Sequence, residues 1–361
     1  ARCDLGVALR DKGDFGAALQ ACREAVRIDP NFAPGHASLG LALHRIGDLD
    51  GAVQACEQAV RIDPRYALGH HSLGFVLFVK GDVDAAIDAL RASLRLDPDN
   101  APAHYDLGLA LFGKGDLDGA IAACRSAVGL DPNHVRAFMV LGNALRKAGD
   151  LDAALAAYRE ALRIDPSDAR VHANLGIALG AKGDFDGSVE ALRRAAQLDP
   201  GLRGIGFALA HAERFAELHA RLPGVLAGRD TPTTAAEWLT FAEMCSGTGD
   251  YASAARFWRE AFEADPRLAA DVGAGHRYNA ACAAARAGSE WHEQARAWLR
   301  EDLAAWGVAP VAAAAVARTL RHWKADPDLA AVRDGEGVPA EWRDLWADVD
   351  ALLARAEEAA K

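Results

Sequence analysis

The sequence predicts an all-α fold in which antiparallel helical pairs stack into an α-α superhelix with a C-terminal helical cap. Three observations support this prediction: a Leu-Gly pair recurs every 34 residues, a Gly-Asp pair stands inside each period, and an Asp-Pro pair ends it. A fixed period of this length is the signature of a repeat protein. The Leu-Gly pairs are Leu5-Gly6, Leu39-Gly40, Leu73-Gly74, Leu107-Gly108, Leu141-Gly142 and Leu175-Gly176.

Each recurring pair has a physical role in a helical hairpin. The Gly of Leu-Gly is followed twelve positions later by another small residue, and small side chains let two helices approach closely. The Gly of Gly-Asp can adopt the left-handed conformation that ends a helix, and the Asp is a good N-cap for the next helix. Asp-Pro ends the second helix, because proline has no amide hydrogen and disfavours a helical conformation before it. One hairpin cannot bury its apolar face alone, so neighbouring hairpins should stack.

The register of the repeat divides the chain. Six tandem helical pairs are expected first. The register is lost beyond Pro200, where Gly201–Gly206 is Gly-rich and Leu222-Pro223 breaks the helical pattern again, which predicts a degenerate repeat or a hinge. The spacing returns between Trp238 and Pro266, so two further helical pairs are expected. The expected division is 1–200 for the six pairs, 201–232 for the hinge, 233–308 for the two further pairs and 309–361 for the capping helices.

The C-terminal segment predicts two capping helices, near Pro310–Trp323 and Pro339–Ala360. An amphipathic helix of this kind would cover the open apolar end of the stack. The apolar face of the second helix consists of Trp342, Leu345, Trp346, Val349 and Leu352.

The composition limits the kinds of partner. The formal net charge is −11 with Lys and Arg interspersed among Asp and Glu, whereas nucleic-acid binding needs a clustered basic surface. No nucleic-acid partner is expected, and no membrane insertion, because the longest apolar stretches are far shorter than the roughly 20 residues that span a bilayer. Six Cys without a Cys-x-x-Cys pair argue against a disulfide framework or a zinc module. We expect a cytoplasmic protein, and we interpret the start at Ala1 as that of a piece of a longer chain.

Three patterns resemble functional motifs, and each has a simpler interpretation. Asp14-Phe15-Gly16 spells the magnesium-binding tripeptide of protein kinases. Its Asp, however, is the Asp of a Gly-Asp pair, which recurs at the same position (column) of each repeat, so the tripeptide predicts a repeat turn. Four histidines share one column, yet stacked helices lie about 8 to 10 Å apart, too far for a common zinc. Three cysteines also share a column and are interpreted as core residues. No metal site, cofactor or catalytic site is therefore expected. These columns are His36, His70, His104 and His172, and Cys22, Cys56 and Cys124.

In register, these columns resemble the tetratricopeptide-repeat family. The resemblance implies a solenoid that binds a protein or peptide in a concave groove lined by the first helix of each pair. The positions it places on that face are apolar in the middle repeats and basic or amide-bearing in the fifth and sixth, which favours a peptide with an acidic end. The alternative is that the aromatic side chains pack between repeats. The candidate residues are His71, Phe75, Phe78, Tyr105, Leu109, Phe112, Met139, Asn143, Arg146, Lys147, Arg170 and Asn174.

The predicted face differs from the family's carboxylate clamp at one position. That clamp has a lysine one turn before the position of Asn143, where this chain has Met139.

The C-terminal third resembles the tail of large bacterial tetratricopeptide serine/threonine protein kinases. The resemblance implies a kinase domain before the repeats, and repeats that recruit substrates or partners. The segments on which it rests are Glu213–Phe215, Leu222–Gly228, His276–Ala284, Trp298–Trp306, His322–Leu329, Trp342 and Leu345–Val349.

Three functions remain open on the sequence alone. The leading hypothesis is a protein-interaction scaffold that serves as the partner-docking tail of such a kinase. The second is a structural spacer. The third is an enzyme with a site in the irregular 201–232 segment or the cap, where His211, Glu217 and His219 cluster without a nucleophile.

Overall fold

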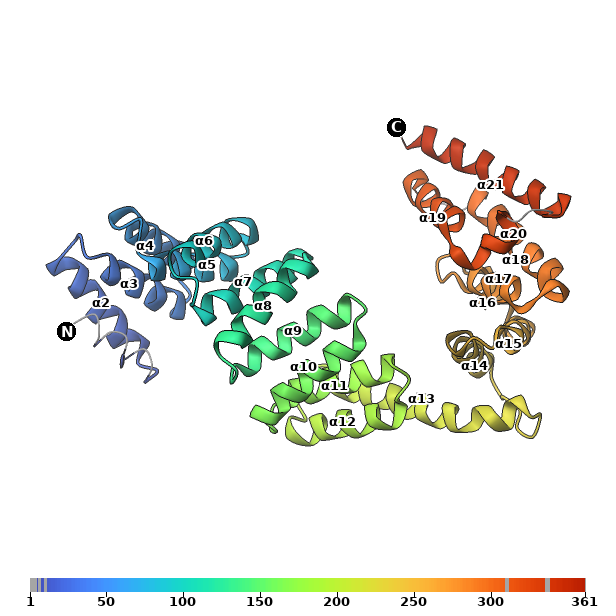
Figure 1. Ribbon diagram of the computed structural model, residues 1–361, viewed down its shortest axis with the longest axis horizontal. Coiled ribbons are helices and arrows are strands. Elements are labelled where there is room, and N and C mark those ends of the chain that lie inside the picture. The colour runs from blue at the N-terminus through green and yellow to red at the C-terminus, as the bar shows by residue number, and fades with distance from the viewer. Residues whose placement is uncertain (1–4, 6–7, 10–11, 309–311, 335–337, 361) are drawn as a thin grey trace. The chain divides into compact units, whose positions relative to one another are not determined.

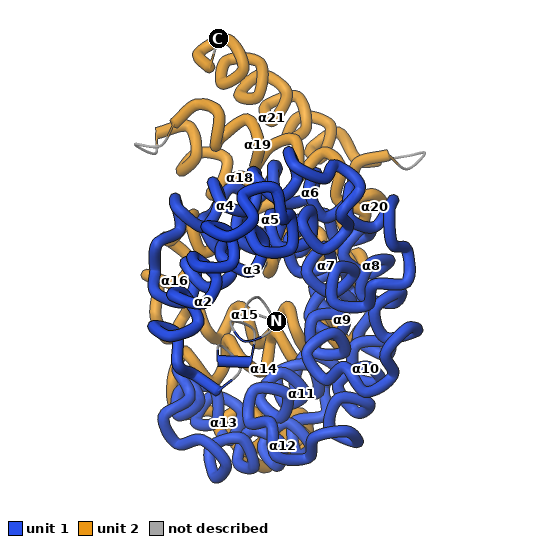
Figure 2. The backbone as a smooth tube through the Cα atoms, turned by 90° about the vertical axis from the view of Figure 1, so that its left-hand side faces the viewer, with its two compact units in different colours: residues 1–213 blue, residues 214–361 orange. Residues whose placement is uncertain are grey.

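The computed structural model describes residues 5, 8–9, 12–308, 312–334 and 338–360. Every regular element in these residues is a helix. The chain forms two compact units, unit 1 over residues 1–213 and unit 2 over residues 214–361 (Figure 2). Gly6 of the first Leu-Gly pair and Pro310 at the expected start of a capping helix lie outside the described residues.

Unit 1 consists of consecutive helical pairs (Figure 1). The second helices of successive pairs begin at Leu49, Leu117 and Leu151 among others, in steps of 34 residues or multiples of it, which confirms the predicted period. The helices are α2 (Phe15–Ile28), α3 (Ala33–Arg45), α4 (Leu49–Ile62), α5 (Ala67–Lys80), α6 (Val83–Leu96), α7 (Ala101–Lys114), α8 (Leu117–Leu130), α9 (Val135–Lys147), α10 (Leu151–Ile164), α11 (Ala169–Ala181) and α12 (Phe185–Leu198). Helix α13 (Ile205–Leu226) begins in unit 1 and continues past residue 213 into unit 2.

The turn inside each pair has the predicted chemistry. Gly115 ends α7 with a φ of 89°, and all the positive φ angles in the described residues belong to glycine. The side chain of Asp116 then accepts a hydrogen bond of 3.0 Å from the amide of Gly119 and so caps α8. Asp14 caps α2 in the same way, which confirms that Asp14-Phe15-Gly16 is a repeat turn.

The histidine column has a structural role in the turn between pairs. Each ring nitrogen Nε2 lies within hydrogen-bond distance of the carbonyl oxygen of the proline six residues earlier, as in His36 with Pro30 at 2.9 Å. His70, His104 and His172 repeat this contact at 2.9 to 3.0 Å. The imidazole thus connects the end of one pair to the first turn of the next helix.

The two helices of a pair meet at the Gly of Leu-Gly. A Cβ atom added to Gly108 would lie 2.5 Å from the Sγ of Cys124, and one added to Gly142 would lie 2.5 Å from the ring of Tyr158. Cys56 and Cys124 are fully buried, and burial raises the pKa of each thiol to about 12. The interpretation of these cysteines as core residues is therefore confirmed.

The first helices of successive pairs form one face of unit 1. Helices α3, α5, α7, α9 and α11 contact one another in sequence. Figure 2 shows them on the inside of the curve that unit 1 follows, with α4, α6, α8, α10 and α12 outside. We call this inner surface the concave face.

Most of residues 201–232 form one long helix. Helix α13 continues through Pro223, where the sequence pattern predicted a break. Proline removes one backbone hydrogen bond, but Leu218 before it and Val225 after it are both buried in the core of unit 2. Burial on both sides of the proline holds the last turn in the helix.

Unit 2 contains a repeat-like pair followed by a bundle of helices. Thr234 and Asp250 cap α14 and α15, and Gly249 between them has a φ of 83°, as in the turns of unit 1. The elements are α14 (Ala235–Thr248), α15 (Tyr251–Ala264), α16 (Pro266–Ala270), α17 (His276–Ala287), η1 (Ser289–Trp291), α18 (His292–Val308), α19 (Ala313–Ala325), η2 (Pro327–Leu329), α20 (Ala330–Arg333) and α21 (Ala340–Ala359).

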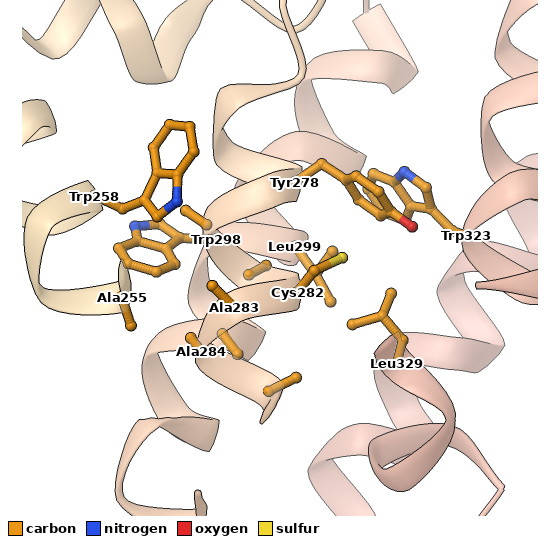
Figure 3. Packing of buried hydrophobic residues seen from close by; sticks show 14 of the residues in the cluster. Ala255, Trp258, Tyr278, Cys282, Ala283, Ala284, Trp298, Leu299, Trp323 and Leu329 are labelled. Carbon is orange, nitrogen blue, oxygen red and sulfur yellow. The ribbon is translucent and has the colours of Figure 1, made fainter. Parts of the chain in front are cut away.

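Aromatic side chains form the core of unit 2. Trp258, Trp323 and Trp342 are each about 1% exposed, and Trp298 packs with them in the same cluster. The rings of Tyr278 and Trp323 stack with centroids 5.3 Å apart (Figure 3). Helix α21 packs on α18 and α19 with Trp342, Leu345, Trp346 and Val349 buried, as its amphipathic pattern predicts.

A buried ion pair joins α17 to α18. The Nε of Arg277 lies 2.8 Å from an oxygen of Asp302, and both side chains are buried. Arg277 also pairs with Glu301 at 2.7 Å. Burial raises the pKa of Asp302 to about 6, because lost hydration outweighs the attraction of Arg277.

In the described part of the chain, each helix is too short or too polar to cross a membrane.

The contact at Gly108 predicts a local, steric loss of stability. Gly108→Ala should destabilise the protein by about 1 to 3 kcal/mol, because its methyl group must displace Cys124. The control is Gly129→Ala, where an added Cβ meets nothing within 4 Å, and it should be neutral or stabilising by up to about 1 kcal/mol. Hydrogen exchange should show lost protection in α7 and α8 before α11 and α12. Equal effects of the two substitutions would contradict the close-approach argument.

The pKa of Asp302 predicts an unusual dependence of stability on pH. The unfolded carboxyl titrates near pH 4, so between about pH 4 and 6 the folded state binds more protons. The stability that this group contributes is therefore full below pH 4 and is lost as pH rises to about 6. Relative to Asp302→Asn, the wild type should lose on the order of 2 to 3 kcal/mol between pH 4 and 7.

Denaturant unfolding followed by tryptophan fluorescence measures this difference, because all eight tryptophans lie between Trp238 and Trp346 in unit 2. A wild-type stability that rises with pH relative to Asp302→Asn would show that the attraction of Arg277 dominates, and an unchanged difference between the two would show that attraction and burial cancel.

Candidate functional site

The candidate ligand-binding residues lie on consecutive helices of the concave face. Helix α5 contacts α7, α7 contacts α9, and α9 contacts α11, so the structure brings these helices together in one surface of unit 1. Their candidate residues are His71, Phe75 and Phe78 on α5, Tyr105, Leu109 and Phe112 on α7, Met139, Asn143, Arg146 and Lys147 on α9, and Arg170 and Asn174 on α11.

The apolar candidates are half-buried. The ring of Phe75 meets His44 of α3 edge-on, with centroids 5.1 Å apart. Phe78 and Phe112 both pack against the cluster that contains Leu111. Leu109 and Met139 pack against the next cluster along the chain. These side chains therefore join neighbouring repeats, and each also leaves part of its surface open.

Tyr105 fits the alternative that aromatic side chains pack between repeats. Its side chain is 7% exposed, and burial raises the pKa of its hydroxyl. The ring lies 4.8 Å from that of His134, which caps α9, and the guanidinium of Arg136 lies 5.3 Å from its centroid. Tyr105 is a packing residue between repeats, because the start of the next first helix covers it.

Three polar side chains meet below the surface of α9. The hydroxyl of Tyr158 on α10 donates a hydrogen bond of 2.7 Å to Asn143. Arg146 interacts with the same hydroxyl and partly offsets the rise that burial causes in the pKa of Tyr158. The Nε of Arg146 is buried and has no hydrogen-bond partner in the described residues. A buried unsatisfied donor of this kind is costly, and an acceptor from a ligand would relieve it.

The basic residues of α9 and α11 divide into paired and unpaired groups, which include Arg136 of α9 although it is not one of the candidate residues. Arg170 makes two hydrogen bonds to Asp168, at 3.2 and 2.8 Å, so its charge is already compensated. Arg136, Arg146 and Lys147 make no ion pair with any described carboxylate. Lys147 is exposed, with its ammonium 5.6 Å from the centroid of the Phe112 ring.

The remaining polar candidates are partly satisfied by neighbours. His71 lies 2.8 Å from Asp106 of α7, which ties α5 to α7. Asn174 is half-buried on α11.

The sequence analysis missed the partners of the candidate residues. His44, Asp106, His134 and Tyr158 all contact side chains on the predicted face, yet they belong to other positions or other helices. The available signal was His134 at the N-cap position of α9. The other contacts depend on how far apart neighbouring repeats lie in space, and the repeat period in the sequence does not give that distance.

Stacked helical pairs with unpaired cations and half-buried rings on one concave face define a helical-repeat scaffold for protein–protein interaction. Comparison with known families agrees. Tetratricopeptide-repeat models match residues 3–67, 73–135 and 169–202, and a further TPR-repeat model matches residues 142–183. The N-terminal half of the chain therefore belongs to the tetratricopeptide-repeat family.

The solved structures of pilF and of the Cut9–Hcn1 assembly share this fold. The structure of pilF from Pseudomonas aeruginosa has a TM-score of 0.53 at 19% identity, over 59% of this chain and 96% of that chain. The Cut9 and Hcn1 hetero-tetramer of the APC/C gives 0.53 at 22% identity, over 58% of this chain and 42% of that chain. YrrB, described as a TPR protein with an unusual peptide-binding site, gives 0.47 at 24% identity, over 54% and 99%. No curated protein matches the sequence.

Proposed function

We propose that unit 1 binds an acidic peptide segment of a partner protein on the concave face formed by α7 and α9. The observation that supports this proposal is the set of three cations, Arg136, Arg146 and Lys147, without carboxylate partners among the described residues. They lie on or beside a surface with half-buried Phe112 and Met139.

Arg146 is the residue expected to contribute most. Its guanidinium can bind a carboxylate with two parallel hydrogen bonds, and its Nε has no partner in the described residues. Lys147 is exposed, so it should attract an acidic segment at a distance more than it fixes one. The open edges of Phe112 and Met139 can cover an apolar side chain next to the acidic one.

This proposal predicts a selective effect of charge removal on peptide binding. With a fluorescein-labelled peptide Glu-Leu-Phe-Glu-Glu as probe, Arg146→Gln should weaken binding roughly tenfold at low salt. The control is Arg159→Gln on the outer helix α10, where the same change should alter binding less than about twofold. Fluorescence anisotropy measures both dissociation constants, and the difference should shrink as salt screens the charges.

Two outcomes would contradict the proposal. One is equal binding of a peptide in which lysine replaces each glutamate. The other is no binding of either peptide, which would favour a structural spacer.

We further propose that the chain is the partner-docking tail of a serine/threonine protein kinase. The support is the C-terminal resemblance, whose most distinctive residues assemble in one place. Tyr278, Trp298, Trp323 and Trp342 all belong to the core cluster of unit 2. The residues that carry the resemblance therefore belong to one folding unit.

The kinase proposal predicts two separate results. The gene should encode a Gly-rich loop, a catalytic-loop Asp and an Asp-Phe-Gly element upstream of Ala1, and the purified 361-residue chain should not hydrolyse ATP. Sequencing upstream of Ala1 tests the first result, and a magnesium-dependent phosphate-release assay tests the second. An upstream frame without these elements would contradict the kinase association. Steady turnover by the purified chain would contradict a purely binding role.

A further inference from the structure

Unit 2 contains a polar pocket that the proposed function does not use. Its volume is about 470 Å³, in the range of pockets that hold small ligands or single side chains. Helices α14, α15, α17 and α19 line it together with η2. The residues used below are Glu243, Tyr251, Trp258, Tyr278, Arg286 and Asp326.

The one arginine that lines this pocket is already compensated. The guanidinium of Arg286 lies 2.7 Å from Asp328 and 4.0 Å from the centroid of the Tyr251 ring. An ion pair stacked on an aromatic ring contributes a wall of the pocket and little net charge. The charge of the pocket therefore depends on its other two carboxylates.

Glu243 and Asp326 leave the pocket negative. Glu243 pairs with no Lys or Arg among the described residues, and burial raises its pKa despite the opposing influence of His276. Asp326 accepts a hydrogen bond of 2.5 Å from the hydroxyl of Tyr278, which orients its carboxylate. The ring of His322 lies 3.6 Å from Asp326 at the exposed edge. A cation in the pocket would compensate both carboxylates.

The pocket also has a hydrogen-bond donor without an acceptor. Trp258 lines it, is 1% exposed, and its indole N–H makes no hydrogen bond to a described residue. A buried donor in this state costs about 1 to 3 kcal/mol, which an acceptor from a ligand would recover. A peptide carbonyl is such an acceptor, whereas a simple metal or ammonium ion is not.

We propose that this pocket binds an arginine side chain of a peptide, with the guanidinium facing Glu243 and Asp326 and a peptide carbonyl accepting from the indole of Trp258. A planar guanidinium suits a site with two carboxylates and aromatic walls better than the compact ammonium of lysine. The site lies in unit 2 and selects the opposite charge from the site proposed on unit 1. Either site can therefore fail without the other.

The test uses the full chain labelled with ¹⁵N, in which the eight indole N–H groups give separate signals. Trp258→Phe identifies the signal of Trp258. Titration with acetyl-Gly-Arg-Gly-amide should move that signal, and the shift gives a dissociation constant. The same peptide with glutamate in place of arginine should leave it unchanged, and ethylguanidinium, which has no carbonyl, should bind at least about fivefold more weakly.

The matched variants isolate the charge of the pocket. Glu243→Gln should weaken binding roughly five- to tenfold, because it removes one of the two carboxylates that attract the guanidinium. Glu263→Gln removes the same charge from the exposed surface of α15 outside the pocket and should change binding less than about twofold.

Three results would overturn the proposal. They are no shift of the Trp258 signal at millimolar peptide, an equal effect of Glu243→Gln and Glu263→Gln, and equal binding of ethylguanidinium and the arginine peptide. The last result would identify a site for free guanidinium ions and not for peptides.

Discussion

The close approach of two helices within each pair is the constraint on which unit 1 depends. Gly108 leaves no room for a Cβ beside Cys124, so the side chain opposite can pack directly on the backbone. This contact fixes how far apart the helices of a pair lie, and the next pair must stack on the surface that results. The position of the concave face, and of every side chain on it, follows from that geometry.

The fold could be predicted from the sequence because the residues that determine it lie close together within each repeat. A left-handed Gly, a capping Asp and a helix-ending Asp-Pro act within a few residues of one another, so their effect can be derived without a structure. Tyr105 and Pro223 could not be predicted in this way. The burial of Tyr105 depends on His134 of the next repeat, and the helix around Pro223 depends on Leu218 and Val225 packing in the core of unit 2. Such contacts join residues that no local pattern relates.

Charge distinguishes the two candidate sites more clearly than shape does. On the concave face of unit 1, Arg136, Arg146 and Lys147 have no carboxylate partners in the described residues, whereas Arg170 has one. In the pocket of unit 2 the only arginine is paired and a glutamate is not. Sequence position alone identified the basic residues but could not separate paired from unpaired ones, because pairing is decided by side-chain geometry.

The short-range hydrogen bonds at the turns, including those of the histidine column, affect how the number of repeats can change. His70 lies within hydrogen-bond distance of the carbonyl oxygen of Pro64, and Asp48 caps helix α4, which begins at the next residue. Each of these hydrogen bonds joins residues that are only a few positions apart in the sequence. A duplicated or deleted period would keep its own set of such bonds intact. Local closure of this kind also keeps contact order low, which favours rapid folding from any pair. Whole repeats can therefore be added to or removed from such an array without any change to the residues that form its turns.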